Sequence, residues 1–235
     1  MKNINLIKAV SGISILIGAG IFSACNKDEE KLPEFMLEGH YIVGITAPVN
    51  SDRNSPYILT FKGDGTGILT TITSSFPGTY EVTDDSLIFQ TADREKWVSF
   101  GFRNNELGDS KYEVRFYRDD DTYEPAPVKY KATGALGKTP DTNQLAGKTF
   151  VGNQYRFGTE DVYIEDHTYV FRADGTAYGS GIGDINENGN TYQLYKNVAF
   201  RYAKDNVKEF GALIDGKLVV FRESGLFYWG TYEPR

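Results

Sequence analysis

Cysteine, histidine, tryptophan and methionine are all scarce in this chain. Its 235 residues include one Cys, two His, two Trp and two Met. One cysteine cannot form a disulfide within the chain or a cysteine-ligated zinc site, and two histidines leave little material for acid–base or metal chemistry. The fold must therefore be held together by the packing of its side chains.

Basic clusters are also lacking. The chain carries 25 Lys and Arg against 32 Asp and Glu, for a formal net charge of −7. Removal of residues 1–24, which contain Lys2 and Lys8 but no acid, lowers this charge to −9. Because an acidic surface repels a phosphate backbone, we expect no nucleic-acid partner.

Long hydrophobic runs are absent apart from one near the N-terminus. Lys2 and Lys8 accompany an apolar stretch at 9–22, the arrangement of a secretory signal. Its fourteen residues are too few to cross a hydrocarbon core of about 30 Å as a helix, so a retained membrane span is disfavoured. We expect residues 1–24 to be a signal peptide that is removed.

The end of this stretch resembles the lipobox of bacterial lipoproteins. Small residues at Ser23 and Ala24 precede Cys25. The resemblance implies that Cys25 is acylated and becomes the first residue of a protein anchored in the outer membrane. The alternative is an ordinary signal peptide followed by an incidental cysteine.

The next charged residues, Lys27, Asp28, Glu29 and Glu30, are similar to the export signal of surface lipoproteins in Bacteroidota. This resemblance implies that an acidic tether over 25–36 presents the protein to the cell exterior. The alternatives are a solvated tether without a signal function and retention on the periplasmic side.

Three short segments recur in the same order at nearly constant offsets of 108, 110 and 109 residues. The pairs are 37–41 with 145–149, 61–66 with 171–176, and 122–125 with 231–234. A constant offset indicates an internal duplication.

The duplication divides the mature chain into two domains. We expect a first β-domain at 37–130, a linker at 131–144 that is rich in Gly and small polar residues, and a second β-domain at 145–235.

Within each copy, hydrophobic residues alternate with a period of two. The first copy shows this at 57–61 and 67–72, on either side of an Asp64-Gly65 turn that is typical of a hairpin. The 16 Tyr and 15 Phe also favour strands. The sequence predicts an all-β chain with little helix, in which each copy has about eight short antiparallel strands arranged as a small barrel or sandwich.

Particular motifs strengthen this prediction. Leu-x-Gly at 37–39, Phe-x-x-Asp-Gly-Thr at 61–66 and Gly-x-Tyr at 78–80 resemble the lipocalin-like, or calycin-like, domains of Bacteroidota lipoproteins. The resemblance covers 37–125 and 145–235 and implies two tandem antiparallel barrels.

Groups suited to catalysis are few. His40 and His167 do not occupy matching places in the two copies, and no Gly-x-Ser-x-Gly elbow supports a Ser-His-Asp arrangement. We interpret both as surface or strand-edge histidines. The acidic residues at 119–121 and 160–166 are interpreted as solvated turns rather than as the paired carboxylates of a glycosidase. We therefore predict a protein without enzymatic activity.

One loop has a partial metal signature. Asp184, Asn186 and Asn188 stand at the first, third and fifth positions of an EF-hand calcium loop, but Tyr195 replaces the bidentate Glu at the twelfth. An EF-hand is therefore excluded. A calcium loop between strands and an ordinary Asn-Gly hairpin turn remain as alternatives, and we expect no other cofactor.

A surplus of aromatic residues in the second copy makes the best case for ligand binding. These residues fall on both faces of neighbouring strands, and a single small core cannot absorb them all. They serve either to stack on sugar rings or apolar ligands, or to pack one copy against the other. The residues are Tyr192, Tyr195, Tyr202, Phe227, Tyr228 and Trp229.

Together these features predict a non-catalytic, lipid-anchored cell-surface protein whose tandem β-domains bind a glycan or a small apolar molecule. The alternative is a structural or protein-interaction module of an envelope complex.

Overall fold

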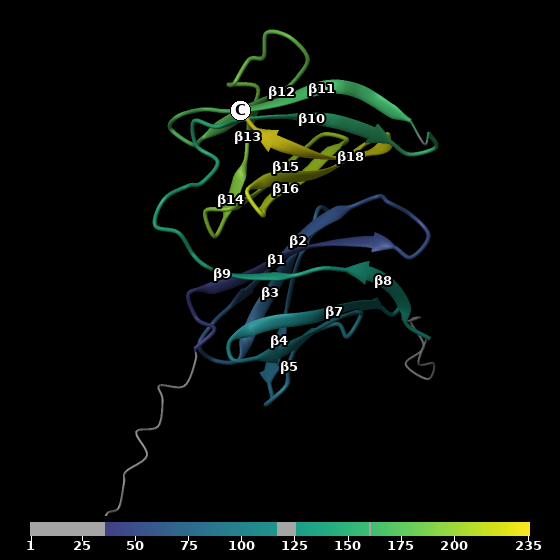
Figure 1. The fold of residues 1–235 in the computed structure, drawn as a ribbon, viewed down its shortest axis with the longest axis vertical. Helices are drawn as coiled ribbons and strands as arrows, with labels where there is room; N and C mark the ends of the chain where they lie inside the picture. The colour runs from purple at the N-terminus through teal and green to yellow at the C-terminus, as the bar shows by residue number, and fades with distance from the viewer. Residues whose placement is uncertain (1–35, 117–125, 160) are drawn as a thin grey trace, which may run out of the picture. The chain divides into compact units, whose positions relative to one another are not determined.

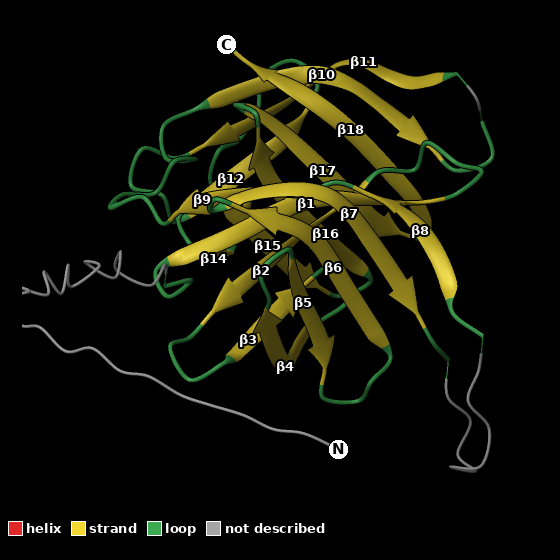
Figure 2. Ribbon diagram, turned by 60° about the horizontal axis from the view of Figure 1, so that its bottom comes forward, coloured by secondary structure: helices red, strands yellow, loops and turns green. Residues whose placement is uncertain are grey.

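Strands are the regular secondary structure of this chain (Figure 1). The computed structural model describes residues 36–116, 126–159 and 161–235, and these contain eighteen strands and no helix (Figure 2). The expected all-β fold is confirmed. All of these described residues belong to one compact unit. The signal peptide, Cys25 and the charged residues Lys27 to Glu30 lie outside the described residues.

The first eight strands form a closed antiparallel barrel. Each strand pairs with the next along the chain, and β1 also pairs with β8, which closes the sheet on itself. Closure removes the unpaired edges that an open sheet would expose. The strands are β1 (His40–Pro48), β2 (Ser55–Phe61), β3 (Thr66–Thr70), β4 (Ser75–Val82), β5 (Ser86–Thr91), β6 (Lys96–Arg103), β7 (Glu106–Val114) and β8 (Val128–Ala132).

A further strand corrects the expected linker. β9 (Ala135–Lys138) lies inside the range 131–144, yet it pairs with the first half of β1, where His40 faces Lys138. β8 pairs with the last residues of the same strand. Residues up to Lys138 therefore belong to the first barrel, and the connection to the second barrel is shorter than the sequence indicated.

β9 lacks the alternating apolar residues of a typical strand, and contacts at Thr133 and Gly137 explain why it pairs with β1 all the same. The Thr133 N–H donates to the Ile45 carbonyl at 3.0 Å, and the Thr133 carbonyl accepts the Tyr57 hydroxyl at 2.7 Å, which fixes the bend between β8 and β9. At Gly137 a Cβ atom would lie 2.6 Å from the ring of Tyr41. β9 thus depends on close backbone approach rather than on alternating apolar side chains.

The second barrel repeats this eight-stranded plan with one break. β10 pairs with β18, so its first and last strands meet. The strand between β12 and β15 is divided at Tyr192 into β13, which pairs with β12, and β14, which pairs with β15. The barrel is therefore nearly closed. Its strands are β10 (Thr149–Arg156), β11 (Val162–Phe171), β12 (Ala177–Gly181), β13 (Asn190–Thr191), β14 (Gln193–Tyr195), β15 (Ala199–Lys204), β16 (Val207–Ile214), β17 (Lys217–Ser224) and β18 (Leu226–Pro234).

The first pair of repeated segments adopts the same local structure in both barrels. Leu37 and Leu145 are buried, and each carbonyl accepts the N–H of the residue three positions later, at 2.9 and 3.0 Å. Gly39 and Gly147 follow with φ values of 81° and 71°, a conformation that favours glycine. Each turn leads into the first strand of its barrel.

The second pair of repeated segments forms equivalent hairpins, between β2 and β3 and between β11 and β12. In both turns the aspartate Oδ1, from Asp64 or Asp174, accepts the N–H of the threonine two residues later at 3.0 Å. Gly65 and Gly175 have positive φ values of 79° and 69°. In the third pair, residues 122–125 lie outside the described residues, whereas 231–234 form the end of β18.

Each barrel encloses an apolar core, and a third apolar cluster contains residues of both barrels. The first core includes Tyr57 and Phe100, and the second includes Phe150 and Phe200. The third cluster lies on the opposite faces of the strands, so the barrels pack together through parts of their outer surfaces. Its buried members are Val43, Ile58, Ile72, Val198, Ala199, Phe210, Ala212 and Phe221.

Candidate ligand-binding site

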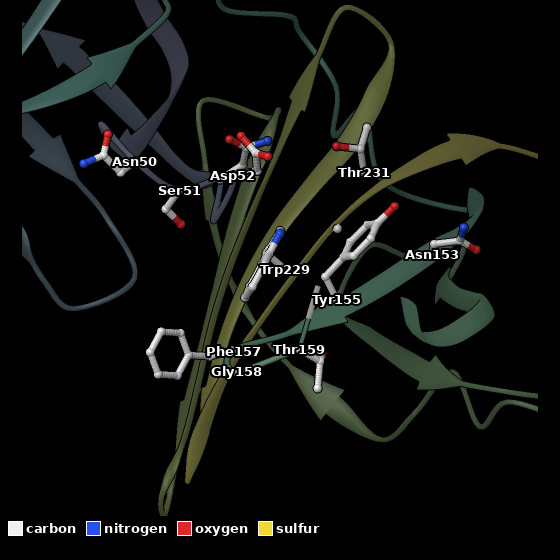
Figure 3. A pocket seen from close by; sticks show the side chains of 12 residues that line it. Asn50, Ser51, Asp52, Asn153, Tyr155, Phe157, Gly158, Thr159, Trp229 and Thr231 are labelled. Carbon is white, nitrogen blue, oxygen red and sulfur yellow. The ribbon is translucent and has the colours of Figure 1, made fainter. Parts of the chain in front are cut away.

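Two aromatic rings lie side by side on the outer surface of the second barrel (Figure 3). Tyr155 on β10 and Trp229 on β18 are directly opposite each other in the strand register. Their ring centroids are 6.2 Å apart and their planes differ by 18°. Both side chains are partly exposed, so solvent can reach this stacked pair, which is called the platform below.

Strand alternation explains why these rings face outward. On β18, Gly230 is buried and Tyr228 lines the barrel interior, so Trp229 between them points to the outside. On β10, the buried side chain of Gln154 places Tyr155 on the outer face. Because the first and last strands pair only when the barrel closes, closure brings these two residues together.

The outward pairs on β10 and β18 change from polar to apolar along the strands. Asn153 faces Thr231, and Tyr155 faces Trp229. Beyond β10, the ring of Phe157 lies edge-on to that of Phe227, with centroids 6.4 Å apart. The platform therefore has a hydrogen-bonding end and an aromatic end.

A loop of the first barrel forms the other side of the site. The connection between β1 and β2 places Arg53 beside the aromatic end, with its guanidinium carbon 5.3 Å from the Phe157 centroid and 5.1 Å from that of Phe227. Cation–π contacts of this kind hold the loop against the second barrel. The Arg53 N–H also donates to Ser51 Oγ at 3.1 Å, which shapes the loop locally.

The loop and the platform enclose a cavity of about 960 Å³, which is large enough for a ligand of several rings. The lining combines the two rings with side-chain amides from Asn50, Asn54 and Asn153. Hydroxyl groups come from Ser51, Thr159 and Thr231. Amides and hydroxyls both donate and accept hydrogen bonds, so this lining suits a ligand rich in hydroxyl groups.

Asp52 is the one carboxylate among the described lining residues. Its Oδ1 lies 3.6 Å from the Lys131 ammonium, and its side chain is 98% exposed. A single exposed carboxylate of this kind cannot act as the carboxylate pair that glycoside hydrolysis uses.

The six aromatic residues singled out in the sequence separate into two groups. Tyr195, Phe227 and Trp229 lie on the outer face and pack against the cluster shared by the two barrels. Of these, Trp229 also lines the cavity. The outer face thus includes both of the roles that the sequence left open, packing between the copies and an accessible aromatic surface.

The other three residues face the interior of the second barrel. Tyr192 and Tyr202 pack against its core, and Asn143 donates a hydrogen bond to the Tyr192 hydroxyl at 2.9 Å. Tyr228 lines a smaller, separate cavity together with Tyr163. The centroids of these two rings are 5.6 Å apart. These three therefore do not belong to the outer site.

The candidate calcium loop forms an exposed turn. Asp184, Asn186 and Asn188 are all exposed, and Asn186 Oδ1 accepts the N–H of Asn188 at 3.0 Å. Asn186 also accepts the Gly189 N–H through its carbonyl at 3.1 Å. Within 36–116, 126–159 and 161–235, no group of three or more His, Cys, Asp or Glu residues is placed to hold a metal ion.

One histidine lies where the sequence did not place it. His40 is the partly exposed first residue of β1, but His167 is only 6% exposed. The interpretation of His167 as a surface residue is therefore wrong. It continues the inward face of β11, two residues before the buried Tyr169 and four before the buried Phe171. That alternation was visible in the sequence, but the barrel interior it faces was not.

Tyr155, Asn153 and the loop at 50–54 were not recognised as site residues from the sequence. The alternation along 149–156 marks an outward position for Tyr155, but nothing local indicates its partner. Comparisons with protein-family models, with curated proteins and with solved structures find no match to this chain. In the described part of the chain, no helix is long and apolar enough to cross a membrane. The fold defines a protein of tandem eight-stranded, lipocalin-like barrels.

Proposed function

We propose that this chain binds a neutral carbohydrate on the outer face of its second barrel. The observation that carries the proposal is the Tyr155–Trp229 pair, two stacked and partly exposed rings inside a cavity lined by amides and hydroxyls. Sugars have apolar C–H faces and polar edges, and this combination of side chains matches both.

The charge of the chain favours a neutral carbohydrate over an acidic one. The formal net charge is −7, and Asp52 contributes a negative charge to the cavity itself. A field of this sign disfavours the approach of anionic ligands.

The test uses the two tryptophans of the chain separately. Trp97→Phe leaves Trp229 as the sole tryptophan, and its emission should change on titration with neutral oligosaccharides and soluble polysaccharides. Trp229→Ala should weaken binding by about 1–3 kcal/mol, as for other aromatic anchors. Trp97→Phe is the matched control and should bind as the wild type does. Equal binding by Trp229→Ala contradicts the proposal.

We also propose that the protein is a lipoprotein of the outer membrane. The support is the sequence at Ser23, Ala24 and Cys25. Cys25→Ser should move the protein from the membrane fraction to the soluble fraction. Recovery of the serine variant in the membrane pellet contradicts lipid anchoring.

Surface display is a separate proposal that rests on Lys27, Asp28, Glu29 and Glu30. Neutral residues at these four positions should protect the protein from protease added to intact cells, while Cys25 still anchors it. Unchanged cleavage would assign these residues to a simple solvated tether.

Stacking and hydrogen bonding to amides need no metal ion. Chelation with EDTA should therefore leave carbohydrate binding unchanged. A loss of binding that calcium restores would instead assign a role to Asp184, Asn186 and Asn188.

A protein-interaction module is the second candidate, and one observation favours it. Phe157 is 54% exposed at the edge of the site, and such a ring fits the centre of a protein contact. Phe157→Ser should then remove a specific cross-link to a partner protein in intact cells. Carbohydrate binding by Trp229→Ala discriminates between the two candidate functions, because it should fall only if the outer site binds carbohydrate.

A further inference from the structure

The interior of the second barrel contains a buried charged network. Glu209 on β16 is fully buried, and it accepts hydrogen bonds from Tyr169, from Tyr178 at 2.8 Å and from Arg222 at 3.2 Å. All three partners are donors, which is the arrangement that an ionised carboxylate requires.

The network holds Arg222 in its charged form. Burial raises the pKa of Glu209, while Arg222 and the tyrosine hydroxyls act in the opposite direction. Burial is the largest influence on Arg222 and opposes its charge, but the Glu209 carboxylate and the neighbouring tyrosines together outweigh it, so the pKa of Arg222 is raised. The Arg222 guanidinium donates to Glu209 through one nitrogen, Nη1, and has further N–H donors on its other nitrogens. The Arg222 side chain is 28% exposed.

Those donors face a cavity of about 240 Å³, separate from the outer site. Besides Arg222, its lining includes Gln154, His167, Ser180 and Tyr228. Since a water molecule occupies roughly 30 Å³ in the liquid, the cavity has room for about eight groups of that size. It therefore fits a small molecule, not an oligosaccharide.

His167 is the second observation that points to a ligand. Its side chain lines the cavity at 6% exposure, and its Nδ1 is buried without a hydrogen-bond partner among the described residues. Burial, aided by the charge of Arg222, lowers the pKa of His167 to about 4, so the ring is neutral at pH 7. A buried polar nitrogen without a partner is costly, and a ligand group at hydrogen-bond distance would remove that cost.

A second guanidinium stands near the same cavity. Arg156 lies opposite Tyr228 in the strand register, and its guanidinium carbon is 4.3 Å from the centroid of Tyr163, another lining residue. Its Nε is also buried and has no hydrogen-bond partner in the part of the chain that the structure describes. Two guanidinium groups therefore lie at this end of the barrel, that of Arg222 in the cavity lining and that of Arg156 beside it.

We propose that this cavity binds a small hydroxylated carboxylic acid. The ligand carboxylate accepts hydrogen bonds from the free edge of Arg222, and its hydroxyl group forms a hydrogen bond with His167 Nδ1. The guanidinium decides the class, because a carboxylate accepts charge-assisted hydrogen bonds from it and a neutral ligand of the same size forms only weaker ones. This inference does not depend on carbohydrate binding at the outer face.

The first test is calorimetric titration of the full chain at pH 7 with lactate, glycerate and malate, and with glycerol as the uncharged counterpart. Saturable binding of at least one acid and none of glycerol is expected. Binding of none of the three acids, or equal binding of glycerol, overturns the proposal.

The second test is His167→Phe. Phenylalanine keeps an aromatic ring against Tyr169 and Tyr232, whose ring centroids lie 5.1 and 5.8 Å from that of His167. Affinity for the acid should fall at least tenfold, while the ligand-free variant should melt no lower than the wild type because an unpartnered nitrogen is gone. Wild-type affinity in this variant overturns the proposal. Trp229→Ala should bind the acid normally, which separates this cavity from the outer site.

Discussion

At the scale of the residue, two buried polar side chains depart most from the pattern of an apolar barrel. Glu209 has its hydrogen-bond partners inside the protein, whereas His167 Nδ1 has none within 36–116, 126–159 and 161–235. The Glu209 network stabilises the interior only while all of its hydrogen bonds are present. The unpaired nitrogen of His167 lowers the stability of the folded protein. Their different states lead to two different experiments.

Acid should weaken the protein through His167. Its folded-state pKa of about 4 lies below the usual 6.5, so the unfolded chain binds a proton that the folded chain does not between these values. The free energy of unfolding should fall as the pH drops from about 6.5 to about 4, by up to about 3 kcal/mol. Urea unfolding across this range measures the effect, and His167→Phe should show a flatter profile. Hydrogen bonds from Thr66 and Thr176 lower the pKa values of Asp64 and Asp174. These carboxylates therefore affect the free energy of unfolding at a lower pH than His167 does.

Removal of Glu209 should be strongly destabilising. Glu209→Leu leaves Arg222 and the hydroxyls of Tyr169 and Tyr178 buried without their acceptor, a loss of about 3–5 kcal/mol. The double variant Glu209→Leu with Arg222→Met removes both charges and should recover most of that loss. Denaturant midpoints compare the three proteins, and a double variant no more stable than the single one would contradict this account.

At the scale of the element, the repeated Asp-Gly hairpins provide a matched pair. Gly65 and Gly175 both have positive φ, so alanine is strained at either position. A Cβ at position 65 meets open space, but at position 175 it would lie 2.6 Å from Asn143 Nδ2. Asn143 cannot move freely, because its amide donates to Tyr192 and its Oδ1 accepts the Leu145 N–H at 2.9 Å.

Gly65→Ala should therefore cost about 1 kcal/mol, and Gly175→Ala clearly more. Thermal unfolding of the two variants under identical conditions gives the comparison. Equal losses would mean that the Asn143 contact does not constrain the second hairpin.

At the scale of the whole molecule, we expect the shared apolar cluster to make the two barrels unfold together. Ala212 is fully buried in this cluster and faces away from the interior of its own barrel. Ala212→Asp places an unpaired charge between the barrels while leaving both cores intact. Calorimetry should show one transition for the wild type and two for the variant. Ala203→Asp, at an exposed position on the neighbouring strand, is the control and should keep one transition.

Much of the fold follows from local patterns. Alternation with a period of two identifies strands, and the Asp64-Gly65 and Asp174-Gly175 turns identify hairpins, because both signals involve residues close together in the sequence. The sequence did not predict β9, because its pairing partner, β1, lies far away along the chain. Its own sequence, with Gly137 at a close approach, contains no alternation to mark it.

The sequence by itself determined the all-β class, the repeated hairpins and the scarcity of catalytic groups, since each depends on residue type and short-range order. Tertiary structure alone decided which side chains meet. Closure of the second barrel joins its first and last strands, and this brings Tyr155 to Trp229 on the outside. The same closure turns His167 and Arg222 toward one interior cavity. Contacts between residues so distant in sequence depend on the register of the closed sheet, which no local pattern contains.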